Sequence, residues 1–252
     1  MKKLFFTSNT KHYHKENDIK VANEIDNTNS IVDQIKDMLE RQNTILYIAA
    51  SPDDYEKVDS YSKLIFDGFK FSGFDFKNYL ILDRRTADLV KKYVETADLI
   101  FLSGGDTFVE NEFFKDVKLK ELLENYQGII VGQSAGSINL ASNVYNSPED
   151  GNETDIKTIY FDGLGLSNIN IEPHFKLNSE LFDENELYQR RHILNESNTR
   201  TIYALCDGAH IIETDGEITV FGESYLIKDG NIIPLCKDRE SFIIRSSSKI
   251  KK

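Results

Sequence analysis

The chain has 252 residues, a formal net charge of −12 and 40% hydrophobic residues. This composition supports a sizeable core, and the length suits one α/β domain over residues 1–252. The acidic balance argues against a nucleic-acid partner, which would require a basic patch. No apolar run approaches the ~20 residues that span a bilayer, so we expect no membrane association and a cytoplasmic location. The two cysteines, Cys206 and Cys236, are too isolated for a disulfide framework or a metal site.

Short apolar runs alternate with amphipathic segments along the first half of the chain. This pattern is typical of a mostly parallel sheet flanked by helices on both faces. The expected strands are 4–8, 44–49, 79–82, 98–102 and 128–131. The expected helices are 30–42, 51–69, 83–94 and 108–124, and the polar stretch 9–24 is predicted to be a loop.

The second half of the chain changes in character. It contains strand-like runs at 158–161, 168–171 and 201–205 and a predicted helix at 184–194. Two further strand pairs surround Asp215-Gly216 and Asp229-Gly230, as in β-hairpins. No repeat or linker indicates a domain boundary. The predicted fold class is therefore α/β, a mostly parallel sheet flanked by helices on both faces, with C-terminal β-hairpins.

Residues 132–136, Gly-Gln-Ser-Ala-Gly, lie between a predicted strand and a predicted helix. They match G-x-S-x-G, the nucleophile elbow, in which small residues flank a serine on a sharp bend. The bend would expose Ser134 at the carboxyl edge of the sheet. The amide of Ala135, at the start of the helix, would face a developing oxyanion. The alternative is a glycine-rich turn in which the serine only caps a helix.

A serine nucleophile needs a general base. Among the five histidines, only His174 comes directly after a strand-like run and follows a proline that fixes its approach. If that strand belonged to the same sheet, His174 would reach the edge that carries Ser134. The alternative is a structural histidine.

A second turn, residues 103–107, follows the strand at 98–102 and reads Ser-Gly-Gly-Asp-Thr. Adjacent glycines allow the backbone to approach a ligand, so the amide of Gly105 could join that of Ala135 in an oxyanion hole. The turn could equally be a helix start capped by Asp106 or Thr107. Nucleotide binding is not indicated, because neither glycine-rich phosphate motif occurs.

The segments 102–108, 132–136 and 171–175 together resemble peptidase family S51, which comprises aspartyl dipeptidase (dipeptidase E) and the cyanophycinases. The resemblance extends over most of the chain. It implies a fold like that of class I glutamine amidotransferases, with a serine in place of their cysteine. It also implies that Ser134 is the nucleophile, His174 the base, and the Gly105 and Ala135 amides the oxyanion donors. Asp106 departs from the family pattern, which commonly has asparagine there, and its charge would oppose an oxyanion unless the side chain turns away.

The resemblance leaves two candidates for the acid of the triad. Asp207 lies in Leu-Cys-Asp-Gly, which matches a Leu-Pro-Glu-Gly turn of aspartyl dipeptidase, and is the first choice. Glu149, about fifteen positions after the nucleophile, is the second. Either carboxylate would hold the imidazole in one tautomer and stabilise the imidazolium. The alternative for both is an exposed acid in a turn.

Aspartyl substrates would require a cation, and Arg190 and Arg191 in the helix after His174 are candidates, although a solvated helix face explains them equally well. We predict a serine-type peptidase that hydrolyses small aspartyl peptides through an acyl-enzyme, without metal or cofactor, as a monomer or homodimer. One alternative is a hydrolase of β-aspartyl or cyanophycin-like peptides. The other is a catalytically silent, amidotransferase-like binding protein.

Overall fold

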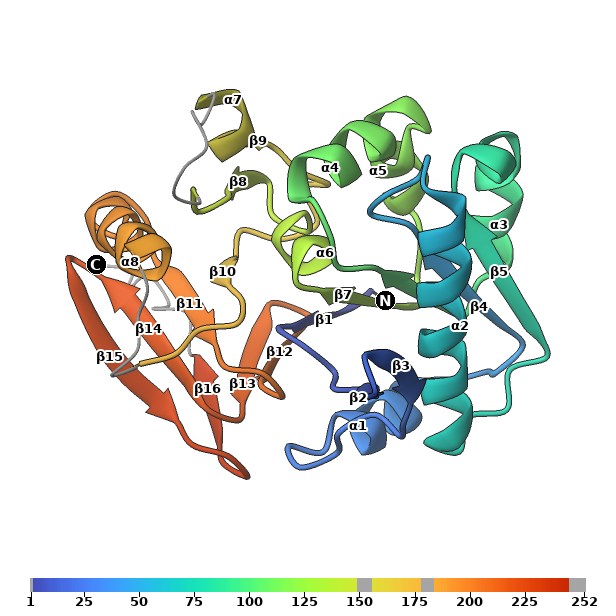
Figure 1. The fold of residues 1–252 in the computed structure, drawn as a ribbon, viewed down its shortest axis with the longest axis horizontal. Coiled ribbons are helices and arrows are strands. Elements are labelled where there is room, and N and C mark those ends of the chain that lie inside the picture. Colours follow the sequence, from blue (N-terminus) through green and yellow to red (C-terminus); the bar gives the residue numbers. More distant parts are fainter. Residues whose placement is uncertain (1, 149–155, 178–183, 245–252) are drawn as a thin grey trace, which may run out of the picture.

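The computed structural model describes residues 2–148, 156–177 and 184–244. Its main sheet consists of β1 (Lys3–Thr7), β4 (Thr44–Ile48), β5 (Asn78–Leu82), β6 (Leu99–Leu102), β7 (Ile129–Gln133), β12 (His210–Thr214), β13 (Glu217–Phe221) and β16 (Ser241–Ile244). The strands are ordered β16-β13-β12-β1-β7-β6-β4-β5 (Figure 1). From β1 to β5 all neighbours are parallel, whereas β12, β13 and β16 pair antiparallel.

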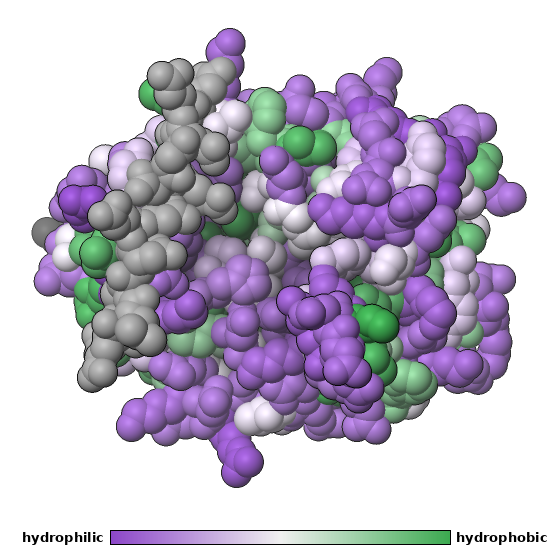
Figure 2. All heavy atoms as spheres, viewed as in Figure 1, coloured by the Kyte–Doolittle hydropathy of each residue, from purple (hydrophilic) through white to green (hydrophobic). Residues whose placement is uncertain are grey.

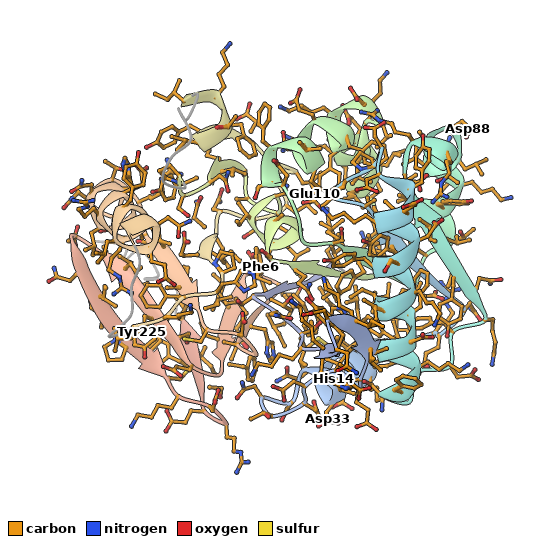
Figure 3. All side chains as sticks on the ribbon, in the orientation of Figure 1. Phe6, His14, Asp33, Asp88, Glu110 and Tyr225 are labelled. Carbon is orange, nitrogen blue, oxygen red and sulfur yellow. The ribbon has the colours of Figure 1, made fainter. Side chains whose placement is uncertain are left out.

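The parallel half of the main sheet, apart from its edge strand β5, is buried on both faces. Its strands are therefore continuous apolar runs instead of alternating patterns. In β1, Phe5 and Phe6 are both 0% exposed and belong to the two cores on opposite faces of the sheet. Figure 3 shows Phe6 near the centre of the molecule.

Helices cover both faces of this sheet. The helices are α1 (Ile31–Met38), α2 (Tyr55–Phe71), the 3-10 helix η1 (Arg84–Leu89), α3 (Val90–Thr96), α4 (Thr107–Asp116), α5 (Leu119–Leu123), α6 (Ala135–Ile138), α7 (Ile156–Ile159) and α8 (Glu184–Glu196). The core of one face includes residues of α1 and α2, and that of the other face residues of α3, α4, α5 and α6 (Figure 1). In the described part of the chain, no helix combines the length and the apolar character needed to cross a membrane.

A second, four-stranded sheet lies beside the main sheet. It consists of β10 (Asn170–Glu172), β11 (Ile202–Leu205), β14 (Ser224–Lys228) and β15 (Asn231–Cys236), in the order β10-β11-β14-β15. A separate small core joins it to α8 and includes Tyr225 of β14 (Figure 3). Two small antiparallel pairs complete the structure, β2 (Tyr13–Glu16) with β3 (Ile19–Ala22) and β8 (Asn143–Tyr145) with β9 (Tyr160–Asp162).

The predicted fold class is confirmed, but several elements differ from the prediction. The expected loop 9–24 contains the β2–β3 hairpin, whose turn places Asn17 and Asp18 at φ 49° and 63°. The expected helix 108–124 is interrupted at Lys118, where φ is 54°, so that α4 and α5 are separate. The expected strand 158–161 is the end of α7 followed by β9. Strand β16 was not predicted.

Candidate active site

The nucleophile elbow lies where β7 meets α6. Ser134 has φ 51° and ψ −111°, and its amide donates to Thr7 O of β1 at 2.9 Å. Both glycines of the motif are required for steric reasons. A Cβ on Gly132 would lie 2.7 Å from the Ser137 backbone, and one on Gly136 would lie 2.4 Å from Leu102 O. The bend therefore requires glycine at both positions, because the contacts are to backbone atoms that cannot move away.

Ser134, His174 and Asp207 form one line of hydrogen bonds. Ser134 Oγ lies 3.1 Å from His174 Nε2, and His174 Nδ1 lies 2.7 Å from Asp207 Oδ1. These distances fit a nucleophile, a general base and an orienting acid. The side chains of His174 and Asp207 are 49% and 42% exposed, so a substrate has access to them.

His174 reaches this position by a route other than the one expected from sequence. Strand β10 belongs to the second sheet, not to the main sheet that carries Ser134. Asp207 follows β11, the parallel neighbour of β10, so His174 and Asp207 leave the second sheet at the same edge. That edge faces the carboxyl ends of β1 and β7, where Ser8 and Ser134 lie.

Ser8 connects the two groups. It follows β1, is 0% exposed, and donates from Oγ to Asp207 Oδ1 at 2.8 Å while accepting from the His174 amide at 2.7 Å. Burial acts to raise the pKa of Asp207. The hydrogen bond and the charge of His174 oppose this effect, as do hydrogen bonds from Ser8 and Asn9, and the net result is a lowered pKa. The acid therefore stays ionised opposite the imidazole. Sequence analysis missed Ser8, although a polar residue at the carboxyl end of a parallel strand was a usable signal.

The two predicted oxyanion donors lie beside Ser134. Gly105 and Ala135 are both near it, and neither amide donates to another described residue. Helix α6 has only four residues, so the individual amides, and not a helix dipole, would stabilise an oxyanion. Asp106 turns away and caps α4, accepting from the amides of Phe108 and Val109 at 3.0 and 2.9 Å. Its charge is therefore directed at the helix start and not at the oxyanion site.

A cavity of about 350 Å³ opens at Ser134, His174 and Gly105. Its wall includes Arg190 of α8, whose Nη1 donates to Leu177 O at 2.8 Å and whose guanidinium lies 5.0 Å from the Phe175 ring. Arg191 is exposed and is not part of this wall. A smaller cavity of about 230 Å³ also includes Ser134 and His174, together with Lys57 and Gln133. A larger one, about 510 Å³, lies at the amino ends of the parallel strands and contains none of these residues.

Glu172, at the end of β10, is a further polar group in the cavity wall that sequence analysis missed. It is 8% exposed and accepts a hydrogen bond from Ser147 Oγ at 3.0 Å. Burial raises its pKa to about 7, although the Ser147 hydrogen bond and the charge of His174 oppose the shift. Glu172 is the last residue of β10, and its place two residues before His174 could have drawn attention to it.

The second candidate acid, Glu149, lies outside the described residues. The structure thus gives a position for Asp207 alone. Within residues 2–148, 156–177 and 184–244, no group of three or more His, Cys, Asp or Glu side chains could hold a metal ion.

Comparison with known proteins agrees with the fold. The sequence matches the model of peptidase family S51 over residues 21–221. The fold resembles the 1.5 Å crystal structure of a protein from Listeria monocytogenes EGD-e that is proposed to be a peptidase E, with a TM-score of 0.59 and 18% identity over 86% of this chain and 96% of that chain. No curated protein matches the sequence. Because the family match extends over far more than half of the chain, the protein belongs to peptidase family S51 and is a peptidase.

Proposed function

We propose that this peptidase is of the serine type and hydrolyses small peptides, aspartyl peptides in particular, through an acyl-enzyme. The observation that carries the proposal is the line from Ser134 Oγ to His174 Nε2, at 3.1 Å, and from His174 Nδ1 to Asp207 Oδ1, at 2.7 Å. This line ends at a cavity near the lower size limit of ligand sites, which suits a short peptide.

In the first half of the reaction, Ser134 Oγ attacks the scissile carbonyl carbon and its proton passes to His174 Nε2. Asp207 keeps the Nδ1 proton in place and stabilises the imidazolium. The amides of Gly105 and Ala135 stabilise the oxyanion. When the C–N bond breaks, His174 returns the proton to the leaving amine. Water then attacks the acyl-enzyme by the same route and releases the acid product.

Arg190 is the residue proposed to select the substrate. It lines the cavity, and a guanidinium can hold a carboxylate by two parallel hydrogen bonds. An aspartyl side chain in the cavity would therefore find a cation there. A β-aspartyl or cyanophycin-like substrate is the alternative, since it carries the same carboxylate chemistry. A panel of dipeptides with varied first residues, including α- and β-linked aspartate, separates these substrates by kcat/KM.

The test of the serine mechanism is the Ser134→Ala variant. Loss of Oγ should lower kcat by on the order of 10⁶ while circular dichroism stays unchanged. A fluorophosphonate should label the wild-type protein at Ser134 and leave the variant unlabelled. Appreciable activity in Ser134→Ala would exclude the mechanism. A folded protein that neither reacts with the fluorophosphonate nor cleaves any dipeptide would instead support a binding protein.

A further inference from the structure

Among the described residues, the charged side chains that line the cavity beside Ser134, apart from His174, are those of Glu172, Lys176, Glu186 and Arg190. Lys176 and Glu186 form an ion pair, with Nζ 2.9 Å from Oε1. Arg190 donates to the backbone carbonyls of Lys176 and Leu177 and lies over the ring of Phe175. Glu172 differs from these, since no cation of the described chain lies within ion-pair distance of its carboxylate.

The carboxylate of Glu172 is buried with one hydrogen bond. Its Oε1 accepts from Ser147 Oγ at 3.0 Å, whereas Oε2 accepts from no described side chain or amide. A buried carboxylate without a cation is unfavourable, and the rise of its pKa to about 7 expresses that cost. The free oxygen is available to a group that enters the cavity.

Glu172 also lies close to the reacting atoms. It is separated from His174 by Pro173 alone, and all three residues line the cavity together with Ser134. A cation bound to Glu172 would therefore lie near the bond that Ser134 attacks. The partner that fits best is an ammonium group, which supplies both the missing charge and hydrogen bonds for the free oxygen.

We propose that Glu172 binds an ammonium group of the peptide substrate in this cavity. The proposal rests on the proposed function, because it places a substrate group beside Ser134. The ammonium could be the free amino terminus of a short peptide or the side chain of a lysine. For an amino-terminal aspartyl residue, the ammonium group would face Glu172 and the side-chain carboxylate would face Arg190.

The experiment measures binding without turnover. Isothermal titration of the Ser134→Ala variant compares Asp-Leu with N-acetyl-Asp-Leu, and N-acetyl-lysine amide with N-acetyl-norleucine amide. The same titrations are repeated in the Ser134→Ala/Glu172→Gln double variant. Glutamine keeps the size of the side chain and can still accept from Ser147, but it removes the charge. A double variant with Glu186→Gln serves as the control, because Glu186 already has Lys176 as a partner.

If Glu172 binds an amino terminus, Asp-Leu should bind about 10- to 100-fold more tightly than its acetylated form, and Glu172→Gln should abolish that preference. If it binds a lysine side chain, the same pattern should appear in the second pair of ligands. Glu186→Gln should preserve the preference. Equal affinities within both pairs, or a preference that persists in Glu172→Gln, would overturn the proposal.

These titrations do not depend on the serine mechanism. Failure of the proposed function would appear as an active Ser134→Ala variant or as absent labelling by fluorophosphonate. Failure of the ammonium site would appear only in the paired affinities. Thermal unfolding of each variant confirms that it is folded, so a loss of binding can be assigned to the missing charge.

Discussion

Ser134 holds a backbone conformation that glycine adopts with far less strain than other residues. Its φ of 51° and ψ of −111° lie outside the regions that side chains with a Cβ favour. Such strain costs about 1–3 kcal/mol, and the surrounding structure must hold it in place. Here β1 does so, through the hydrogen bond from the Ser134 amide to Thr7 O.

The strain predicts that two inactive variants differ in stability. The free energy of unfolding of Ser134→Gly should exceed that of Ser134→Ala by about 1 kcal/mol, because the relief of backbone strain outweighs the added freedom of glycine in the unfolded chain. Urea titration of both variants measures the difference. Ser137→Gly is the control. It should be destabilising, since Ser137 Oγ accepts from the Thr7 amide and donates to Thr7 O, both at 2.9 Å. Equal stability of the two Ser134 variants would show that the conformation is not strained.

The acid of the proposed triad can be tested by a pair of amide variants. Asp207→Asn should leave the protein folded and lower kcat by roughly 10⁴, because an amide favours the wrong imidazole tautomer. Glu149→Gln should be mild. Measurement of kcat for both variants on one dipeptide decides between them. The opposite pattern would assign the role to Glu149, and small losses in both variants would remove either residue from the orienting role.

At the scale of residues, sequence patterns indicated Ser134 and His174, and the family resemblance favoured Asp207 over Glu149; the structure places Ser134, His174 and Asp207 in one line of hydrogen bonds. The elbow motif singled out Ser134, and a strand followed by proline singled out His174. The choice between Asp207 and Glu149 could not be made from spacing, because both are acids in predicted turns. Only the distance of each carboxylate from the His174 ring can distinguish them. Ser8 was missed because it is a single polar residue at a strand end, without a motif around it, and Glu172 was missed because the segment 171–175 was used only for His174.

At the scale of elements, the elbow depends on how closely α6 packs against β6. Gly136 allows this approach, since its position faces Leu102 O and Leu102 Cβ without space for a methyl group. Its amide also donates to Ser103 O at 3.1 Å. Ser134, the proposed nucleophile, is thus held in place by the contact between a single-turn helix and the adjacent strand.

Gly136→Ala should therefore lower the free energy of unfolding by about 1–3 kcal/mol or prevent folding, because an added Cβ would lie 2.4 Å from a backbone oxygen. Gly104→Ala is the matched control. A Cβ there would lie no closer than 3.4 Å to its neighbours, so its effect should stay below about 1 kcal/mol. Chemical denaturation measures both. Similar stabilities for the two variants would contradict the packing argument.

The apolar strands of the main sheet were predictable because burial on both faces leaves uninterrupted apolar runs. The breaks between elements were not, because each depends on a single backbone angle or a tertiary contact. The β2–β3 hairpin is polar along Tyr13–Glu16, so its sequence resembles a loop. The separation of α4 from α5 depends on Lys118, a residue type that does not by itself end a helix. The division into two sheets has no local signal at all.

The burial of Glu110 is another feature that local sequence patterns do not predict. It is fully buried in α4, between that helix and α6 in Figure 3, and it accepts from Asn139 Nδ2 at 2.9 Å. Burial raises its pKa well above the usual range, and the nearby charge of Asp106 acts in the same direction. From sequence, a glutamate in an amphipathic helix is expected on the exposed side.

At the scale of the whole molecule, buried histidines should set the acid limit of stability. Burial lowers the pKa of His210 to about 3, and burial together with the charge of Lys20 lowers that of His12 to about 4. Both pKa values lie below that of an unfolded histidine, about 6.5. Their contribution to stability is therefore complete above pH ~6.5 and is lost as the pH falls toward their folded values.

Between roughly pH 7 and pH 5, the free energy of unfolding should fall by about 2 kcal/mol less in His210→Gln than in the wild type, because the variant lacks this titrating group. Urea titrations at several pH values measure this slope. His14→Gln is the control, because His14 is exposed and its hydrogen bond to Glu16 raises its pKa. That variant should not reduce the loss on the acid side. Identical slopes in wild type and His210→Gln would show that His210 does not titrate on unfolding.

Glu172 acts in the opposite direction. Its pKa, about 7 in the folded protein, lies above the unfolded value, so its contribution is complete below about pH 4.5 and is lost as the pH rises through 7. The protein also carries many exposed charges. Figure 2 shows a face that is largely hydrophilic, with hydrophobic residues in small separate groups. Such charges contribute little individually to stability, so the buried groups should dominate its dependence on pH.

Ser8 follows β1, the neighbour of the strand β7 that leads to Ser134, and its hydroxyl contacts Asp207 and the His174 amide, which follow strands of the second sheet. The proposed nucleophile, Ser134, is therefore positioned by the main sheet, whereas the proposed base, His174, is positioned by the second sheet. Their alignment exists only while the two sheets are docked. A small separation of the two sheets would abolish hydrolysis while every strand stayed intact. The rate of peptide cleavage should therefore report on the contact between the sheets more sensitively than any measurement of secondary structure.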